Sequence, residues 1–240
     1  MKARNLVILT GAGISAESGI STFRDAGGLW ETHRFEDLAS PEGFARDPAL
    51  VHRFYNQRRA QLQAVRPNAA HLALAALEQS WAERGDFLLV TQNVDDLHER
   101  AGSRKLVHMH GELRRLRCTA CETVTVWAAD AGTDTACPAC ARKGAMRPDI
   151  VWFGEVPFYM AEIDAALARA DIFCAIGTSG VVYPAAGFAA AAARNRRGCV
   201  LYEINPRPGG RNLFDEVIAA PASLGVAELL RRLEITGDNG

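Results

Sequence analysis

Short apolar runs that alternate with helix-like segments restrict the fold of this chain more than any other feature. The runs typical of buried strands are residues 5–10, 86–91, 104–109, 171–176 and 198–204. The segments with helical periodicity are residues 68–84, 158–170 and 183–197. This alternation predicts an α/β fold, a doubly wound, Rossmann-like parallel sheet whose ligands gather at the carboxyl ends of the strands.

Two stretches interrupt the alternation. Residues 23–66 contain no clear core strand and are rich in aromatic and charged residues, and residues 112–148 contain short polar turns and paired cysteines. We expect both inserts to form a smaller domain, part helical and part zinc ribbon. The larger, Rossmann-like domain would then consist of residues 1–22, 67–111 and 149–240.

Composition and charge exclude several classes of protein. A chain of 240 residues with 48% hydrophobic residues can bury a full core. The net charge of −1 and the lack of blocks of like charge argue against a nucleic-acid partner. No apolar run approaches the roughly 20 residues of a membrane helix, and the first run is too short for a signal peptide. We therefore expect a cytoplasmic protein without a membrane partner. We also expect it to be a monomer.

Four of the six cysteines form two Cys-x-x-Cys pairs that stand fifteen residues apart. These are Cys118, Cys121, Cys137 and Cys140. Their spacing is that of a zinc ribbon, in which four thiolates close a tetrahedral site and leave no position for a catalytic water. We therefore expect one structural zinc that stabilises a segment with little apolar content. Cys174 and Cys199 lie in apolar runs and are expected to be small buried hydrophobic residues.

A Gly-Ala-Gly turn follows the first apolar run. Gly11 and Gly13 come directly after the strand, and Ala16 stands where the dinucleotide-binding fingerprint has its third small residue. Backbone N–H groups at such a helix start can bind a pyrophosphate, although a tight turn without a ligand gives the same pattern. A dehydrogenase would also need an acidic residue at a strand end about 20 residues later, and none is cleanly placed there.

Polar residues follow the second and third predicted strands. Gln92, Asn93 and Asp95 come after one strand and His110 after the next. These side chains should converge because parallel strands end at the same edge of a sheet. His110 has an ordinary pKa near 6.5 and suits a general base. His108 and His110 could also form a metal-binding pair. In other proteins, an isolated Gln-Asn or His-x-His pair is more often a capping or structural feature.

Taken together, these motifs resemble the sirtuin family of NAD-dependent protein deacylases. The matching stretches are GAGISAESGI with TFRD, TQNVDDLH, HMHGE, the cysteine pairs, VWFGE, GTSGVVYPA and EINP, in the family's order from residue 10 to about 206. One departure is Ser21, where most of the family has proline. This serine removes a fixed φ angle from the cofactor loop.

The resemblance implies that NAD is a substrate to be cleaved, with no hydride transfer. The cofactor-binding residues that it implies are Gly11, Ala12, Gly13, Glu17, Phe23, Arg24, Gln92, Asn93, Asp95, Gly177, Thr178, Ser179 and Asn205. The Gly-Ala-Gly turn would bind phosphate, Phe23 and Arg24 would lie on a mobile cofactor loop, and the TQNVDD residues would surround the nicotinamide ribose. The GTS segment and Asn205 would bind phosphate and the adenosine ribose.

The reaction that the resemblance implies is acyl transfer from lysine to ADP-ribose. The acyl oxygen attacks the ribose carbon as nicotinamide leaves, and His110 then takes a proton from a ribose hydroxyl, which attacks the resulting imidate. The products are free lysine, nicotinamide and O-acyl-ADP-ribose. Rival hypotheses are an NAD-dependent protein ADP-ribosyltransferase, a dehydrogenase and a zinc-ribbon adaptor, and the order of the motifs favours the deacylase.

The resemblance also implies where the acylated-lysine substrate binds. The VWFGE segment, interpreted as a strand, resembles an edge to which the substrate adds as an extended peptide. The substrate-binding residues of this edge are Val151, Phe153, Gly154 and Glu155. We expect the peptide backbone to pair with this edge.

Three residues point to the acyl group. Tyr55 and Arg58 are three apart and share one face of a helix. In most proteins such a pair is a surface feature, but within this family it resembles the signature of members that remove succinyl, malonyl and glutaryl groups. Ala39 matches the small residue of that class. A guanidinium and a phenol can bind the distal carboxylate of a succinyl group, so we expect activity on succinyl and malonyl groups together with acetyl.

Overall fold

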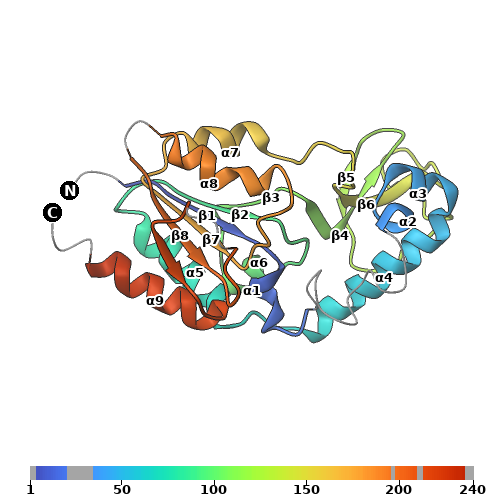
Figure 1. Ribbon diagram of the computed structural model, residues 1–240. Coiled ribbons are helices and arrows are strands. Elements are labelled where there is room, and N and C mark those ends of the chain that lie inside the picture. The colour runs from blue at the N-terminus through green and yellow to red at the C-terminus, as the bar shows by residue number, and fades with distance from the viewer. Residues whose placement is uncertain (1–3, 21–34, 196–197, 210–212, 236–240) are drawn as a thin grey trace.

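The computed structural model describes residues 4–20, 35–195, 198–209 and 213–235 (Figure 1). Within these residues the chain forms a six-stranded sheet, a three-stranded sheet and the helices around them. None of the described helices has the length and apolar character that crossing a membrane requires.

The larger sheet is parallel throughout and has the strand order β3-β2-β1-β7-β8-β9. Its strands are β1 (Leu6–Thr10), β2 (Phe87–Thr91), β3 (Leu106–His108), β7 (Ile172–Ile176), β8 (Val200–Ile204) and β9 (Glu216–Ile218). The predicted doubly wound sheet and its five predicted strands are confirmed. The order reverses between β1 and β7, and such a switch point is where sheets of this type bind ligands.

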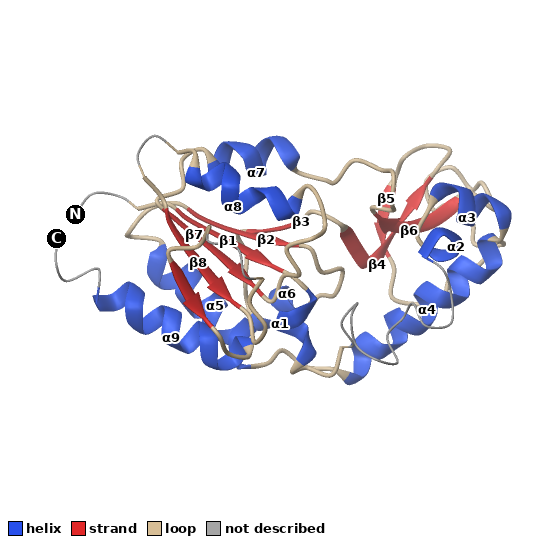
Figure 2. Ribbon diagram, viewed as in Figure 1, coloured by secondary structure: helices blue, strands red, loops and turns tan. Residues whose placement is uncertain are grey.

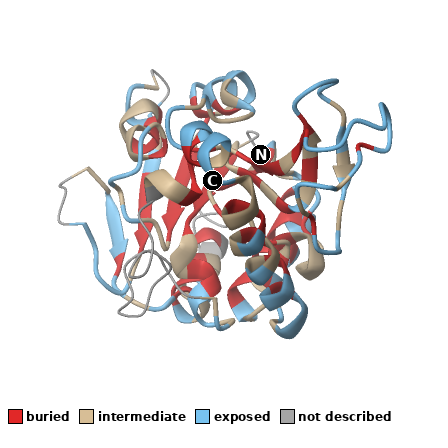
Figure 3. Ribbon diagram, turned by 90° about the vertical axis from the view of Figure 1, so that its right-hand side faces the viewer, coloured by how far each residue is buried: buried red, intermediate tan, exposed pale blue. Residues whose placement is uncertain are grey.

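Helices cover both faces of this sheet (Figure 2). On one face lie α5 (Ala69–Trp81) and α9 (Ala222–Ile235), and on the other α7 (Met160–Leu167) and α8 (Phe188–Ala193). Shorter elements are α1 (Ala12–Ala16), α6 (Leu97–Ala101) and the 3₁₀ turn η1 (Ala185–Gly187). All five residues of β1 are buried, because Leu6 and Ile8 face α5 and α9 while Val7 and Leu9 face α7 and α8. Figure 3 shows buried residues along the strands and the helix faces toward them.

The second sheet is antiparallel and has the order β5-β4-β6. Its strands are β4 (Gly111–Cys118), β5 (Val124–Val126) and β6 (Met146–Ile150). Beside it lie α2 (Phe35–Leu38), α3 (Pro41–Arg46) and α4 (Pro48–Ala64). Asp47 starts α4 by accepting a hydrogen bond from the Leu50 amide at 2.8 Å, and Pro48 fits the first helical position because it needs no acceptor.

One predicted strand is wrong. Residues 151–155, the VWFGE segment, follow β6 as an irregular stretch and a turn, not as a strand edge. Gly154 has a left-handed backbone with φ 90°, and the Glu155 carboxylate accepts the Trp152 amide at 2.8 Å. The amides of Val151 and Phe153 donate to other segments of this chain. These contacts leave no regular row of amides for strand addition.

Candidate functional site

The turn after β1 lies against the loop after β7 at the switch point. The Gly13 amide donates to the Gly177 carbonyl at 3.0 Å, and the Gly11 amide donates to the Ile176 carbonyl at 3.0 Å. A Cβ on Gly13 would lie 2.7 Å from the Gly177 Cα, which is a severe clash. The glycines therefore allow the two loops to touch, and Ala12 lies between two amides that are already engaged.

The loop after β7 is fixed by the residue that follows β8. Asn205 Nδ2 donates to the Thr178 carbonyl at 2.8 Å. Ser179 Oγ accepts the Val181 amide at 3.4 Å, and Gly177 has a left-handed φ of 61°. The structure thus brings the GTS segment and Asn205 together beside the turn after β1.

A buried polar network lies beneath α1. Ser15 Oγ donates to Asp95 Oδ2 at 3.0 Å and accepts from Asn93 Nδ2 at 3.1 Å. His71 Nε2 lies 3.5 Å from the same hydroxyl. Burial raises the pKa of Asp95 and lowers the pKa of His71 to about 4. The network joins α1 and α5 to the segment after β2.

His110 is held in one tautomer by the segment after β2. Its Nδ1 lies 3.1 Å from the Gln92 carbonyl oxygen. Because a carbonyl only accepts, Nδ1 carries the hydrogen and Nε2 keeps a lone pair. Burial lowers the pKa of His110 and outweighs the opposing effect of the Gln92 carbonyl. At neutral pH the ring is therefore an uncharged base at Nε2.

His108 has a different environment from His110. Its Nδ1 lies 3.0 Å from the Asn93 carbonyl oxygen, and its Nε2 lies 2.5 Å from Glu99 Oε1. Burial would lower the pKa of His108, but the hydrogen bond and charge of Glu99 outweigh burial and raise it. Within the described residues, His108 groups with Glu99 and Glu112, and His110 joins no group of three possible metal ligands. The alternative of a His108–His110 metal pair therefore finds no third ligand there.

Tyr55 of α4 extends into an apolar cluster that also contains the VWFGE tryptophan. The cluster is Ala39, Val51, Tyr55, Leu62, Leu113, Ile150 and Trp152. Trp152 Nε1 donates to the Tyr55 hydroxyl at 3.0 Å, and both side chains are buried. Burial raises the pKa of Tyr55 to about 12. The Ala39 carbonyl accepts the Phe153 amide at 2.9 Å, so segments distant in the sequence meet at one place.

Arg58 lies one turn beyond Tyr55 and carries a charge that the described residues do not neutralise by contact. Burial lowers its pKa, while Tyr55 and Asp95 act on it only through longer-range electrostatics. Its Cζ lies 5.7 Å from the centre of the Phe54 ring. In the described part of the chain it forms no hydrogen bond and no ion pair. A half-buried guanidinium in this state is suited to an anionic ligand.

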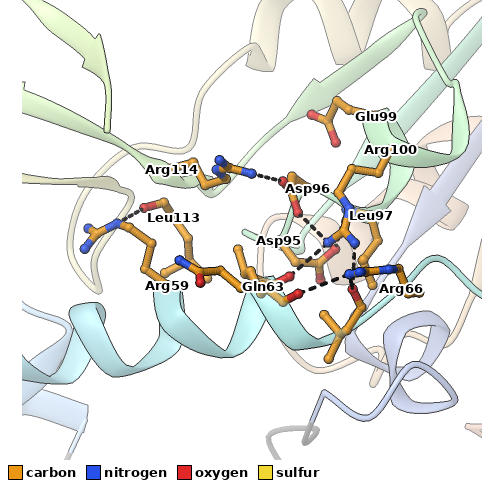
Figure 4. A network of polar contacts seen from close by, with 12 residues as sticks. Arg59, Gln63, Arg66, Asp95, Asp96, Leu97, Glu99, Arg100, Leu113 and Arg114 are labelled. Carbon is orange, nitrogen blue, oxygen red and sulfur yellow. Dashed lines mark hydrogen bonds and ion pairs between the residues drawn. The ribbon is translucent and has the colours of Figure 1, made fainter. Parts of the chain in front are cut away.

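Figure 4 shows a polar network that fixes the end of α4 to the segment after β2. Arg100 of α6 donates to the carbonyl oxygens of Leu62 at 3.0 Å and Val65 at 2.6 Å. Asp96 accepts from Arg100 at 3.4 Å and from Arg114 of β4 at 2.8 Å. The last carbonyls of a helix have no donor within the helix, so Arg100 supplies one from another element.

The four paired cysteines lie together at the end of the smaller sheet, all reduced. The Sγ atoms of Cys118 and Cys140 are 3.8 Å apart, and those of Cys121 and Cys137 are 3.7 Å apart. A tetrahedral zinc with Zn–S bonds of about 2.3 Å requires sulfur atoms about 3.8 Å apart. The arrangement therefore fits one closed, structural zinc site.

Two predicted site residues are engaged in contacts within the chain. The Glu17 carboxylate accepts the amide and hydroxyl of Ser223, at 2.9 and 2.6 Å, near the start of α9. Glu155 binds Arg147 through both oxygens, at 2.6 and 3.0 Å. Phe23 and Arg24 lie outside the described residues.

The sequence analysis did not single out three residues that the structure places at the site. They are Ser15, His71 and Trp152. Ser15 and Trp152 lie inside the motifs GAGISAESGI and VWFGE, so both residues could have been predicted as site residues from these motifs. His71 lies in an alanine-rich helix, where the sequence shows nothing beyond one polar residue on an apolar face.

Comparison with known proteins supports the same family. The sequence model of the Sir2 family matches residues 11–184. The NAD-dependent protein deacylase of Bdellovibrio bacteriovorus is 56% identical over 230 residues, which cover 95% of each chain. That of Escherichia coli K12 is 53% identical over 235 residues, 97% of this chain and 83% of that protein.

Solved structures of Sir2 proteins are also similar to this chain. A Sir2 homologue in complex with NAD has a TM-score of 0.85 and 40% identity, and the match covers 96% of this chain and 90% of that one. A Sir2 complex with a p53 peptide and NAD⁺ has a TM-score of 0.79 and 29% identity, and covers 97% of this chain and 95% of that one.

Proposed function

This chain belongs to the Sir2 family, and on that premise we propose that it is an NAD-dependent protein-lysine deacylase. The observation that carries the proposal is the meeting of His110, Asp95 and the Gly-Ala-Gly turn around one sheet edge. Relatives with more than half of their residues identical are named NAD-dependent protein deacylases. The dehydrogenase and adaptor hypotheses receive no such support, and neither does the ADP-ribosyltransferase.

We propose that NAD binds across the switch point between β1 and β7. When bound, NAD supplies the ADP-ribose that accepts the acyl group. Ala12, the GTS segment and Asn205 would bind phosphate and the adenosine ribose, while Gln92, Asn93 and Asp95 would surround the nicotinamide ribose. The contact between the glycines and the Asn205 bond to Thr178 support this role, because they shape both loops before any ligand binds.

We propose that His110 is the general base. Its Nδ1–H is engaged with Gln92, so Nε2 is the atom that accepts a proton from a ribose hydroxyl. The lowered pKa keeps this atom unprotonated at neutral pH. Positioning of the ring by a backbone carbonyl removes the need for a carboxylate partner.

We propose further that the acyl pocket accepts succinyl and malonyl groups as well as acetyl. Arg58 is a half-buried cation without a bonded partner among the described residues, and Tyr55 offers a hydroxyl near it. A distal carboxylate would accept bonds from both side chains. Ala39, a small side chain in the same cluster, would occupy less of the pocket than a bulky residue at this position.

The substrate would be an acylated lysine in an extended peptide. Exposed apolar side chains lie in and after the VWFGE turn and after the GTS loop, and such side chains commonly bind peptides. They are Phe153, Val156, Tyr159, Val181, Val182 and Tyr183. Because the VWFGE amides are engaged, we propose that pairing uses carbonyl oxygens and flanking residues. We also propose that the protein does not bind nucleic acid, which the net charge of −1 supports, and that it is a monomer.

The decisive experiment uses two peptides that differ only in the lysine acyl group, succinyl or acetyl. Each is incubated with the protein, with and without NAD, and the products are identified by mass spectrometry. We expect NAD-dependent loss of both groups, with one nicotinamide and one O-acyl-ADP-ribose for each lysine released. ADP-ribose attached to protein without deacylation would instead support the transferase, and no cleavage of NAD would refute both.

A further inference from the structure

We propose that Trp152 is a specificity-determining residue that orients the Tyr55 hydroxyl toward the distal carboxylate of the acyl group. The inference rests on the acyl class proposed above and adds a positioning residue to it. Trp152 does not touch the carboxylate in this account. It acts through a single hydrogen bond between two buried side chains, 3.0 Å long.

The direction of this bond follows from the chemistry of the two groups. An indole N–H only donates, so the Tyr55 oxygen must accept. The hydroxyl hydrogen of a phenol lies near the ring plane in one of two orientations, and the indole occupies one side of the oxygen. The Tyr55 hydrogen is therefore left for a donor role on the other side.

Arg58 is a second hydrogen-bond donor close enough to Tyr55 to interact with it electrostatically. Tyr55 and Arg58 influence each other electrostatically, yet no hydrogen bond joins them in the described structure. One anionic acceptor could receive hydrogen bonds from both the hydroxyl and the guanidinium. A carboxylate is the simplest group that does so.

Trp152 is itself held rigidly. The Cζ of Arg147 lies 3.4 Å from the centre of the indole ring. Arg147 is paired with Glu155, and Glu155 also accepts the Trp152 amide at 2.8 Å. The side chain is only 2% exposed. A phenylalanine could fill much of this space, but it could not donate the bond to Tyr55.

The test measures kcat and KM for succinyl-lysine and acetyl-lysine peptides with Trp152→Phe, Tyr55→Phe and the double variant. Loss of one hydrogen bond should lower kcat/KM for the succinyl peptide roughly 2- to 10-fold in Trp152→Phe. The loss should lie mainly in KM, because the distal carboxylate is remote from the reacting carbonyl. The acetyl peptide has no group that reaches the hydroxyl and should change less than 2-fold.

The double variant identifies the route of the effect. If Trp152 acts through Tyr55, Trp152→Phe should cost nothing further once Tyr55 is phenylalanine. Trp127→Phe is the matched control, because Trp127 donates to the Asp130 carbonyl at 3.2 Å in the zinc segment. It should leave both peptides unchanged. Placing β-(3-benzothienyl)alanine at position 152 keeps the indole shape without the N–H, and it should repeat the effect if Trp152→Phe folds poorly.

Three results would overturn the proposal. They are equal losses on both peptides, losses that multiply in the double variant, and a selective loss in Tyr55→Phe that no change at position 152 reproduces. The acyl class itself is tested separately. If Tyr55→Phe leaves the ratio of succinyl to acetyl activity unchanged, the acyl assignment fails and the role of Trp152 falls with it.

Discussion

The residues of this site are defined by which of their polar atoms are already engaged. His110 has its Nδ1 bonded to Gln92, Tyr55 has its oxygen bonded to Trp152, and Asp95 has both oxygens bonded to neighbours. Arg58 alone among these four forms no bond within the described structure. The groups left free in the described structure are therefore a base at Nε2, a phenolic donor and a cation, which are the groups that the proposed removal of carboxyacyl groups would use.

The role of His110 gives the first prediction. His110→Ala should lose roughly 10²- to 10⁴-fold in turnover, the range of general base catalysis, because no other base in the described site replaces Nε2. Since burial lowers the pKa of His110, the acid limb of kcat/KM should lie below pH 6.5. Nicotinamide release measured from pH 5 to 8 checks both. Turnover near that of the wild type, in a variant with an unchanged melting temperature, would refute the assignment.

Arg58 gives the second prediction. Arg58→Met keeps the apolar stem and removes the charge. Truncation of one partner of a desolvated charge pair costs about 2–5 kcal/mol, or roughly 30-fold to several thousand-fold in kcat/KM for the succinyl peptide. The acetyl peptide should change little. Arg58→Lys is the control, because it keeps the charge but lacks the planar guanidinium. Its kcat/KM for the succinyl peptide should lie between those of the wild type and Arg58→Met. Equal losses on both peptides would mean that Arg58 supports structure or NAD binding.

At the scale of elements, the end of α4 depends on a residue from α6. Arg100→Met removes the donors to the carbonyl oxygens of Leu62 and Val65 together with the 3.4 Å contact to Asp96, in a side chain that is 25% exposed. We expect a loss of about 1.5–3 kcal/mol in the free energy of unfolding, measured with urea. Arg66→Met is the matched control, because among the described residues Arg66 donates only to the carbonyl oxygens of Gln63 and Val65, its near neighbours in the sequence. It should cost under about 0.5 kcal/mol. Similar losses in the two variants would show that Arg100 does not hold the helix.

The zinc segment is the second element with a distinct prediction. Cys137→Ser should release the metal, unfold the smaller sheet around β4 and β5, and lower solubility, because the ligands hold a segment with few apolar contacts. Metal content by mass spectrometry should fall from one zinc per chain to near zero. Cys199→Ser, in a cysteine outside the cluster, should keep the full zinc content. Metal-free wild-type protein with full activity would contradict the assignment.

At the scale of the molecule, we propose that the larger domain comprises residues 1–22, 67–111 and 149–240 and the smaller domain residues 23–66 and 112–148. The two described sheets support this division except at two bounds, because the smaller sheet begins at Gly111 of β4 and ends at Ile150 of β6, one residue before position 112 and two residues after position 148. Arg100 and Arg114 both reach Asp96 from different sides of the proposed boundary. The acyl pocket would then lie where the domains meet.

Sequence predicted the larger sheet well because buried parallel strands are continuous apolar runs. It missed β9, which has three residues and only one buried, and β4, whose charged residues hide an alternating pattern. The VWFGE segment was predicted as a strand from its apolar residues. The turn that it forms depends on a hydrogen bond from the Trp152 amide to the Glu155 side chain, which the apolar pattern does not reveal. Likewise, no local sequence pattern shows that Arg100 contacts the end of α4. Its two acceptors, Leu62 and Val65, precede it in the sequence by 38 and 35 residues.

Buried histidines make the stability of the whole molecule depend on pH. Burial lowers the pKa of His71 to about 4 and that of His98 well below its usual value. His71 is fully buried at the start of α5, where its Nδ1 lies 3.3 Å from the Asn68 amide nitrogen and 3.0 Å from Asn68 Oδ1, and this burial is the main cause of its lowered pKa. As the pH falls below 6.5, these histidines therefore bind protons in the unfolded chain but stay neutral in the folded chain.

The last prediction follows from this sign. The free energy of unfolding should fall as the pH is lowered from 6.5 to 5, by up to about 1.4 kcal/mol per pH unit for each such histidine. His71→Gln should flatten this dependence. His108→Gln should act on the alkaline side instead, because Glu99 outweighs burial and raises the pKa of His108, so its stabilisation is lost as the pH rises through that pKa. Urea unfolding of the three proteins between pH 5 and 8 measures all of this. If His71→Gln keeps the slope of the wild type between pH 5 and 6.5, burial does not lower the pKa of His71 and this account of the pH dependence is wrong.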